Sequence, residues 1–209
     1  MSSIVLGADT LLGTTPAIGS VEFDGKAFYN TAQGTQRGII PGAQFFRLNA
    51  DLAGANVSTV QSVFNVSVTL STSTIYAFES VIALSKAAGV TSHTLSVGFG
   101  GSATVNNIGY SIIEKSNTTS FTNLSTSDTV QAFIQTASAT AMSGAVTSAA
   151  QFFMQNIKGT VSINGGGTFT PQYTLSAAPG GAYSTMANSY FLIYPIGASG
   201  ANISVGAWA

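Results

Sequence analysis

Residues 75–84 read Ile-Tyr-Ala-Phe-Glu-Ser-Val-Ile-Ala-Leu, and this stretch decides the fold class. Successive side chains of an extended strand point to opposite sides. One side of this stretch carries four large apolar residues: Tyr76, Phe78, Ile82 and Leu84. The other side is mostly apolar too, with Ile, Ala and Val around Glu79. A strand that is apolar on both sides is typical of the inside of a β-sandwich or of a subunit interface.

Similar runs recur along the chain, and Gly, Pro, Asn and Ser separate them. We expect further strands at 44–48, 94–99, 107–113, 151–163, 168–175, 189–194 and 202–208. About eight to ten short strands with this spacing predict an all-β chain that folds as a sandwich or a barrel.

Turn residues between these runs predict hairpins. Glycine-rich turns predict a hairpin within 94–113 and a second one that joins 151–163 to 168–175. Asp24-Gly25 is the signal of a type I′ turn, so a small hairpin is expected on either side of it, with a plain loop as the alternative.

Helix is expected to be scarce. One helical turn is predicted at 58–64, where Ser58 is a candidate N-cap, and a second at 129–136, after Asp128. The segment 137–150 has weak periodicity and is expected to be an extended surface connection.

Charged residues make up only 6% of the chain, against about 25% in an average soluble domain. The 6 Lys and Arg and 7 Asp and Glu give a net charge of −1. This balance provides no basic surface for phosphates and no cationic segment for anionic lipids, so neither nucleic acid nor membrane insertion is expected. Few charges also protect a monomer poorly against association, which favours an assembled state.

The residue types that carry most catalysis are rare in this chain. It has no cysteine and one histidine, His93, which lies among hydroxyl residues and is expected on the surface of a strand. The acids are scattered, and no metal-binding or phosphate-binding motif is present. We therefore predict no catalytic residues, no cofactor-binding residues, no metal ligands, no cofactor and no enzyme activity.

A hydrolase or lyase is the catalytic alternative, because a trimer can bring carboxylates of different subunits together. The candidates for such a pair are Glu22, Asp24, Glu79 and Glu114. Enzymes of that kind usually need a longer β-helical body than this chain supplies.

Glu79 interrupts an apolar strand, and a buried carboxylate needs a partner. Since cations are few, we expect Glu79 to pair with Arg37 or Arg47, within the subunit or between subunits. The alternative is an exposed Glu79 at the end of its strand.

Four aromatic residues have rings that could stack on sugars: Tyr183, Tyr190, Tyr194 and Trp208. Tyr190 and Tyr194 belong to an apolar run, so we expect them in the core or at a subunit interface, and we expect Trp208 to anchor the last strand. A ligand is expected first at the loops rich in Ser, Thr, Asn and Tyr, which are 100–107, 116–128, 137–148 and 179–188.

Six segments, taken in this order, resemble the C-terminal module of bacteriophage virion proteins, tail fibres and related surface appendages. They are Gly19-Ser-Val-Glu-Phe-Asp-Gly25, Phe28-Tyr29, Arg37-Gly-Ile-Ile-Pro41, Gly167-Thr-Phe-Thr-Pro-Gln172, Asn188-Ser-Tyr-Phe191 and Val205-Gly-Ala-Trp208. The resemblance covers about residues 19–209 and implies a jelly roll of the C1q/TNF kind, an antiparallel β-sandwich that usually trimerises.

The chain is expected to divide into an N-terminal arm, 1–18, and a jelly-roll domain, 19–209. Related fibres carry the module after a long shaft, and only 18 residues precede it here, which favours a head decoration or a short spike over a tail fibre.

The resemblance implies a non-enzymatic structural protein located in the virion. Its expected partners are copies of itself in a homotrimer, other virion proteins through the arm, and host receptor glycans. The alternative is a stand-alone carbohydrate-binding module, similar to a lectin.

Overall fold

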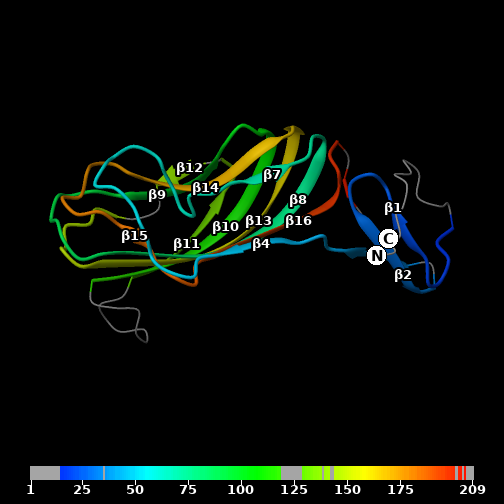
Figure 1. Cartoon of the computed structure of the whole chain (residues 1–209), viewed down its shortest axis with the longest axis horizontal. Coiled ribbons are helices and arrows are strands. Elements are labelled where there is room, and N and C mark those ends of the chain that lie inside the picture. The colour runs from blue at the N-terminus through cyan, green and yellow to red at the C-terminus, as the bar shows by residue number, and fades with distance from the viewer. Residues whose placement is uncertain are drawn as a thin grey trace.

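The structure is a computed structural model of the chain, and it describes residues 15–34, 36–118, 129–137, 139–141, 144–200, 202–203 and 205. Every regular element in these residues is a β-strand, and all their pairings are antiparallel. Two sheets pack face to face, and a third, small sheet extends from one end (Figure 1). The predicted all-β antiparallel sandwich is confirmed, and its layout is consistent with a jelly roll.

The large sheet has eight strands and is built around β8. They are β4 (Gln44–Arg47), β5 (Leu52–Ala53), β8 (Thr74–Lys86), β10 (Thr104–Asn117), β11 (Thr129–Gln135), β13 (Gln151–Gly165), β15 (Ser184–Thr185) and β16 (Tyr190–Ala198). One edge of β8 pairs with β13, which is followed by β10 and β11. The other edge pairs first with β16 and then with β15, and β4 and β5 lie outside these two.

The second sheet has five strands and covers one side of the large sheet. They are β6 (Gln61–Ser62), β7 (Val68–Leu70), β9 (Leu95–Gly100), β12 (Ala139–Ala141) and β14 (Gly167–Leu175). β14 lies at its centre and pairs with β9, β6 and β7.

The core between the two sheets contains a cluster of phenylalanine rings. Phe99 of β9 stacks on Phe169 of β14 at 4.9 Å, and it meets Phe78 of β8 edge-on at 5.0 Å. Phe191 of β16 completes the cluster. Burial of each such ring stabilises the fold by roughly 1.5–3 kcal/mol. Along β8, buried and half-buried residues alternate without a break, as the sequence of residues 75–84 predicts.

The hairpins predicted within 94–113 and between 151–163 and 168–175 are both wrong, because the two strands of each lie in different sheets. β9 lies in the second sheet, whereas β10 lies in the large sheet. β13 and β14 are separated in the same way. Their glycine-rich connection passes between the layers: a Cβ at Gly166 would lie 3.0 Å from the Leu70 carbonyl oxygen, and one at Gly167 would lie 2.7 Å from the Ala103 nitrogen. These glycines permit a close backbone crossing rather than a tight hairpin turn.

The two predicted helical turns are also wrong. Residues 129–135 form the strand β11, which pairs with β10 over seven residue pairs from Tyr110↔Gln135 to Ser116↔Thr129. Residues 58–64 contain the short strand β6 and no helix. In both segments, pairing with a neighbouring strand overrides a weak local N-cap signal. In 137–150, the described residues include β12, so the predicted connection contains a strand of the second sheet.

The small sheet consists of β1 (Val21–Phe23), β2 (Phe28–Gln33) and β3 (Gln36–Ile40). The predicted hairpin is confirmed, with Val21 opposite Asn30 and Phe23 opposite Phe28. Its turn is not type I′, because that turn requires positive φ at two central residues and Gly25 has it (84°) while Asp24 does not. Instead, Asp24 Oδ1 accepts hydrogen bonds from the backbone N–H groups of Lys26 and Ala27.

Parts of the predicted organisation lie outside the described residues. They include residues 1–14 of the arm, Trp208 and most of the expected last strand, of which Asn202, Ile203 and Val205 are described and are not in a strand. The division into 1–18 and 19–209 stays a prediction. Within 19–209, the small sheet and the sandwich are separate sheets that meet where Lys26 Nζ donates to the Thr72 carbonyl oxygen at 2.8 Å.

Candidate functional site

The outer face of the large sheet is the side turned away from the second sheet. Apolar residues of six strands lie on it: Phe45 of β4, Tyr190, Leu192 and Tyr194 of β16, Ala77, Val81 and Ala83 of β8, Met154 of β13, Ile113 of β10, and Val130, Ala132 and Ile134 of β11. Phe45 is 60% exposed and Ile134 is 87% exposed. The described strands of the sandwich form two layers, so no third sheet covers this face (Figure 1).

Glu79 lies on this outer face, and the prediction that it pairs with Arg37 or Arg47 is wrong within the subunit, while a pairing between subunits stays a prediction. Its carboxylate is 3.4 Å from Nζ of Lys158, the residue directly opposite on β13, and its side chain is 36% exposed. Arg37 is bound to Glu22, and Arg47 donates to the side chains of Asn188 and Asn49. Odd-numbered residues of β8 point away from the core, so the Glu79 carboxylate is not buried within the subunit.

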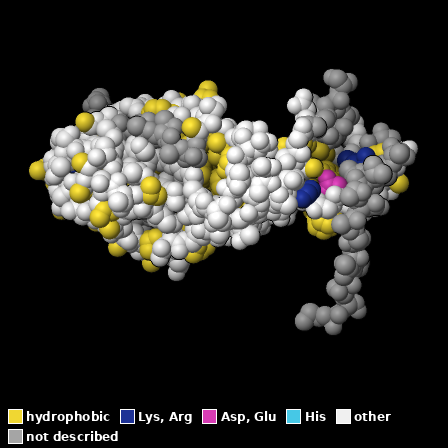
Figure 2. Space-filling model, turned by 90° about the horizontal axis from the view of Figure 1, so that it is seen from above, with side chains coloured by type: hydrophobic (Ala, Val, Ile, Leu, Met, Phe, Trp, Pro, Cys, Tyr) yellow, Lys and Arg dark blue, Asp and Glu magenta, His cyan; other side chains and the backbone are white. Residues whose placement is uncertain are grey.

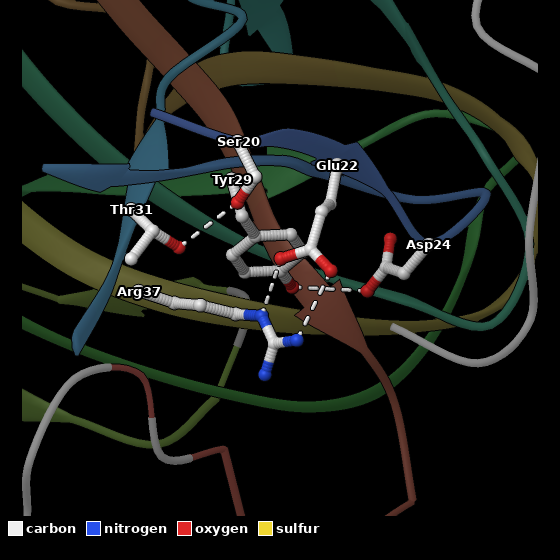
Figure 3. A network of polar contacts seen from close by, with 6 residues as sticks. All are labelled: Ser20, Glu22, Asp24, Tyr29, Thr31 and Arg37. Atoms are coloured by element: carbon white, nitrogen blue, oxygen red, sulfur yellow. Dashed lines mark hydrogen bonds and ion pairs between the residues drawn. The ribbon is translucent and has the colours of Figure 1, made fainter. Parts of the chain in front are cut away.

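Charged side chains concentrate instead on the small sheet. Figure 2 shows Lys, Arg, Asp and Glu side chains over this sheet, whereas the visible side of the sandwich is hydrophobic or uncharged. Arg37 binds Glu22 through two nitrogens, at 2.6 Å from Nε and 3.0 Å from the terminal Nη2 (Figure 3). This hydrogen bond raises the pKa of Arg37.

The same network includes Tyr29 of β2. Its hydroxyl donates to Asp24 Oδ2 at 2.9 Å, while Ser20 and Thr31 bond through their hydroxyls at 3.2 Å (Figure 3). Burial and the bond to Asp24 raise the pKa of Tyr29. The carboxylates of Glu22 and Asp24 are therefore occupied by partners within the small sheet, and they hold its three strands together rather than facing a cleft.

Polar side chains are buried at the end of the sandwich that lies away from the small sheet. We call this set the buried polar cluster: Lys86, His93, Glu114, Gln151, Gln155 and Tyr183. β8 begins at Thr74, next to the contact with the small sheet, and ends at Lys86, so its 13 residues separate the two ends by about 40 Å.

His93 is buried, and the prediction of a surface position is wrong. It is 1% exposed, and its ring nitrogens lie 2.7 Å from the Thr91 carbonyl oxygen and 2.9 Å from the Tyr183 hydroxyl. A carbonyl only accepts, so Nδ1 carries the proton, and Nε2 accepts from the hydroxyl of Tyr183. Burial raises the pKa of Tyr183, with a smaller contribution from Glu114. Both ring nitrogens of His93 therefore have hydrogen-bond partners within the protein.

Lys86 is buried and surrounded by carbonyl oxygens. Its Nζ donates to Gly89 at 2.8 Å, to Ala149 at 3.1 Å, and to Ala88 and Ser148. Burial lowers the pKa of Lys86, because the ammonium loses its water. The side chain connects the loop after β8 to the loop before β13.

Glu114 and Gln151 are the members of the cluster that line a cleft. The cleft has a volume of about 260 Å³ and lies between the end of β10, the start of β11, the start of β13 and residues 144–148. Glu114 is 2% exposed, and its Oε2 accepts from Nε2 of Gln155, its cross-strand neighbour, at 2.8 Å. Burial raises the pKa of Glu114, and the bond to Gln155 opposes this shift.

The loops expected to bind a ligand contribute to this cleft in part. Residues 116–118 and 144–148 line it, and they belong to two of the four predicted loops, whereas residues 119–128 and 142–143 lie outside the described residues. The loop 100–107 lines a different cleft, beside Phe99 and Ala137. In 179–188, Tyr183 is fully buried against His93 and Phe153.

The other aromatic candidates divide between the two sides of β16. Phe191, which lies between them in the sequence, is in the core, while Tyr190 and Tyr194 lie half-buried on the outer face, where Tyr190 contacts the ring of Phe45 at 5.5 Å. Trp208 lies outside the described residues.

The four acids proposed for a catalytic pair are held in separate surroundings. Glu22 and Asp24 serve the small sheet, Glu79 faces outward, and Glu114 alone lines the cleft of the buried polar cluster. The described residues contain no group of three His, Asp or Glu placed to hold a metal ion. They also contain no helix with the length and apolarity needed to cross a membrane.

The buried polar cluster is not among the features expected from the sequence, although strand alternation contains a signal for it. Lys86 follows Leu84 by two positions, His93 precedes Leu95 by two, and Glu114 follows Ile112 by two. Each polar residue therefore continues the inward side of an apolar strand by one step. Extending the inward side of each strand by two positions beyond its apolar run places Lys86, His93 and Glu114 inside.

Comparison of the chain with models of known protein families, with curated proteins and with solved structures found no match. The resemblance to phage surface proteins therefore stays a prediction, and the site is interpreted from its own chemistry.

Proposed function

We propose that this chain is a non-enzymatic structural subunit of a phage particle that assembles with copies of itself, as a homotrimer, through the outer face of the large sheet. The observation that carries the proposal is the uncovered apolar surface of that face, from Phe45 on β4 to Ile134 on β11. Large exposed apolar patches on folded domains mark interaction surfaces.

The charge pattern of the outer face supports a second copy as its partner. Its charged residues are Arg47, Glu79, Lys115 and Lys158, and Glu79 and Lys158 neutralise each other across the sheet. A face with so little uncompensated charge can meet its own copy without strong repulsion. β11 strengthens this interpretation, because it pairs only with β10 among the described strands and so presents a free edge.

The particular role in a virion rests on the order of sequence motifs from Gly19 to Trp208. A head decoration or short spike would use the arm, 1–18, to contact other virion proteins and the opposite end to contact host glycans. Several copies in one assembly could then bind glycans at the same time, which gives an avidity higher than the affinity of a single copy.

The second candidate is a stand-alone carbohydrate-binding module. It is favoured by the cleft beside Glu114, whose walls consist mainly of hydroxyl and amide side chains. This candidate predicts glycan binding by a monomer, whereas the first predicts an obligate oligomer.

The proposal is tested by measuring the mass of the protein in solution by sedimentation or light scattering. We expect a mass three times that of the subunit, and we expect Val130→Lys combined with Ile134→Lys to produce monomers, because two buried ammonium groups would face the partner. Val60→Lys is the matched control, since Val60 (56% exposed) resembles Val130 (54% exposed) but precedes β6 of the second sheet. A monomeric wild type, or a double variant that still assembles, would contradict the proposal.

A further inference from the structure

The cleft beside Glu114 has features of a ligand site that the assembly does not use. It opens at the end of the sandwich opposite the small sheet and is lined by hydroxyl and amide side chains that include Thr129, Gln131 and Thr147. Its volume of about 260 Å³ is just below the range of roughly 300–1,000 Å³ of typical small-molecule sites, so it suits one small ring rather than an extended molecule.

The carboxylate at the bottom of the cleft has no cation beside it among the described residues that line the cleft. Lys86, the buried ammonium of the same cluster, is surrounded by four backbone carbonyls. Glu114 is instead bonded to the amide of Gln155, and Oε1 of Gln155 is buried without a hydrogen-bond partner although the residue is 0% exposed. Gln155 does not line the cleft, so the carboxylate acceptors available to a ligand there are those of Glu114, which accept one hydrogen bond from Gln155 and have lone pairs left over.

The wall of the cleft is held in place by the buried polar cluster. Residue 146 is fixed by two backbone hydrogen bonds between Val146 and His93, at 3.1 and 2.8 Å. Two residues further on, the carbonyls of Ser148 and Ala149 are held by Lys86. A wall that is ordered before binding loses less conformational entropy when a ligand enters.

These features select the chemistry of the ligand. A metal ion would need several anionic ligands, and the described residues contain no such group. The walls offer donors and acceptors together, and the carboxyl at the bottom adds acceptors. We propose that the cleft binds one saccharide unit, whose adjacent hydroxyls donate to Glu114 and exchange hydrogen bonds with Thr147 and the amides around it. This inference deepens the attachment role in the proposed function by naming its site.

The test is saturation-transfer NMR of the full-length protein with methyl glycosides of common hexoses and N-acetylhexosamines as probes. We expect at least one probe to bind saturably at millimolar or lower concentration. Glu114→Gln keeps the size of the side chain and should weaken binding about tenfold, and Thr147→Val should weaken it about threefold, since each removes a hydrogen bond worth roughly 0.5–3 kcal/mol. Glu22→Gln, the same change on the small sheet, should leave binding unchanged.

Several results would overturn the saccharide site. One is the absence of saturable binding by any glycoside up to roughly 50 mM, well above the millimolar range of weak specific binding. Another is binding that Glu114→Gln and Thr147→Val leave unaltered. A third is Glu114-dependent binding of methylammonium or calcium ions in place of sugars. The mass in solution separates this failure from failure of the assembly, because Glu114 lies on the inner side of β10, away from the outer face.

Discussion

The small sheet and the sandwich are held together by different forces. β1, β2 and β3 have little core of their own, and side-chain bonds among Glu22, Arg37, Asp24 and Tyr29 connect them (Figure 3). The sandwich instead buries phenylalanine rings between its layers and keeps its carboxylates apart. A chain with 6% charged residues thus uses charge where apolar burial is scarce.

The difference also separates two kinds of carboxylate. Glu22 is paired with a guanidinium and remains partly exposed, whereas Glu114 is buried with only an amide as its partner. The same Glu→Gln substitution should therefore have opposite effects on stability in the two regions.

The largest effect is expected for Phe99→Ala. Phe99 contacts Phe78, Phe169, Tyr110 and Phe191, so its removal leaves a cavity between the sheets. We expect a loss of about 3–5 kcal/mol in the free energy of unfolding, measured by denaturant titration. A loss below about 1 kcal/mol would mean that the aromatic cluster is not the main source of stability in the sandwich.

Glu114→Gln should stabilise the sandwich at neutral pH by an amount smaller than the loss in Phe99→Ala. Burial raises the pKa of Glu114 in the folded state, so the folded protein retains a proton that the unfolded chain releases. Wild-type stability is then fully present below the unfolded pKa of the carboxyl, and part of it is lost as pH rises through the folded pKa. Glutamine does not titrate, so the stability of the variant does not fall in this way as the pH rises.

The measurement is the melting temperature of both proteins from about pH 4 to pH 8, a range that starts near the ordinary pKa of glutamate. The variant's advantage should grow with pH. An advantage that is the same at every pH, or largest in acid, would contradict a raised pKa for Glu114.

The smallest effect is expected for Glu22→Gln, and it has the opposite sign. The change weakens a bidentate ion pair that is partly exposed, so the cost should be about 0.5–1 kcal/mol after solvent screening. Hydrogen exchange should show faster opening of β1, β2 and β3 and unchanged protection of β8. Added salt should reduce the difference between variant and wild type. Equal loss of protection in β8 would show that the two regions unfold together.

The strands of the sandwich could be predicted from the sequence because their signal is local. Alternation placed β8, β9 and β14 within a few residues and grouped the large apolar residues of β8 on one side of the strand. The sequence could not predict the pairing of β13 with β8 and β10 instead of β14, because the choice between a hairpin and a crossing depends on contacts far apart in the chain. Glu79 was misjudged because its outward position depends on which side of β8 the second sheet covers.

Of the candidate site, the sequence indicated the hydroxyl-rich loops and the scarcity of charge. Alternation along a strand depends only on backbone geometry, so the chain alone determined an all-β fold and the apolar stripe of each strand. The tertiary structure decided which stripes meet, that His93 and Lys86 lie inside, and that Glu114 reaches a cleft with Gln155 behind it. Those outcomes depend on how the two sheets stack and on where distant loops meet, and neither is encoded in the order of neighbouring residues.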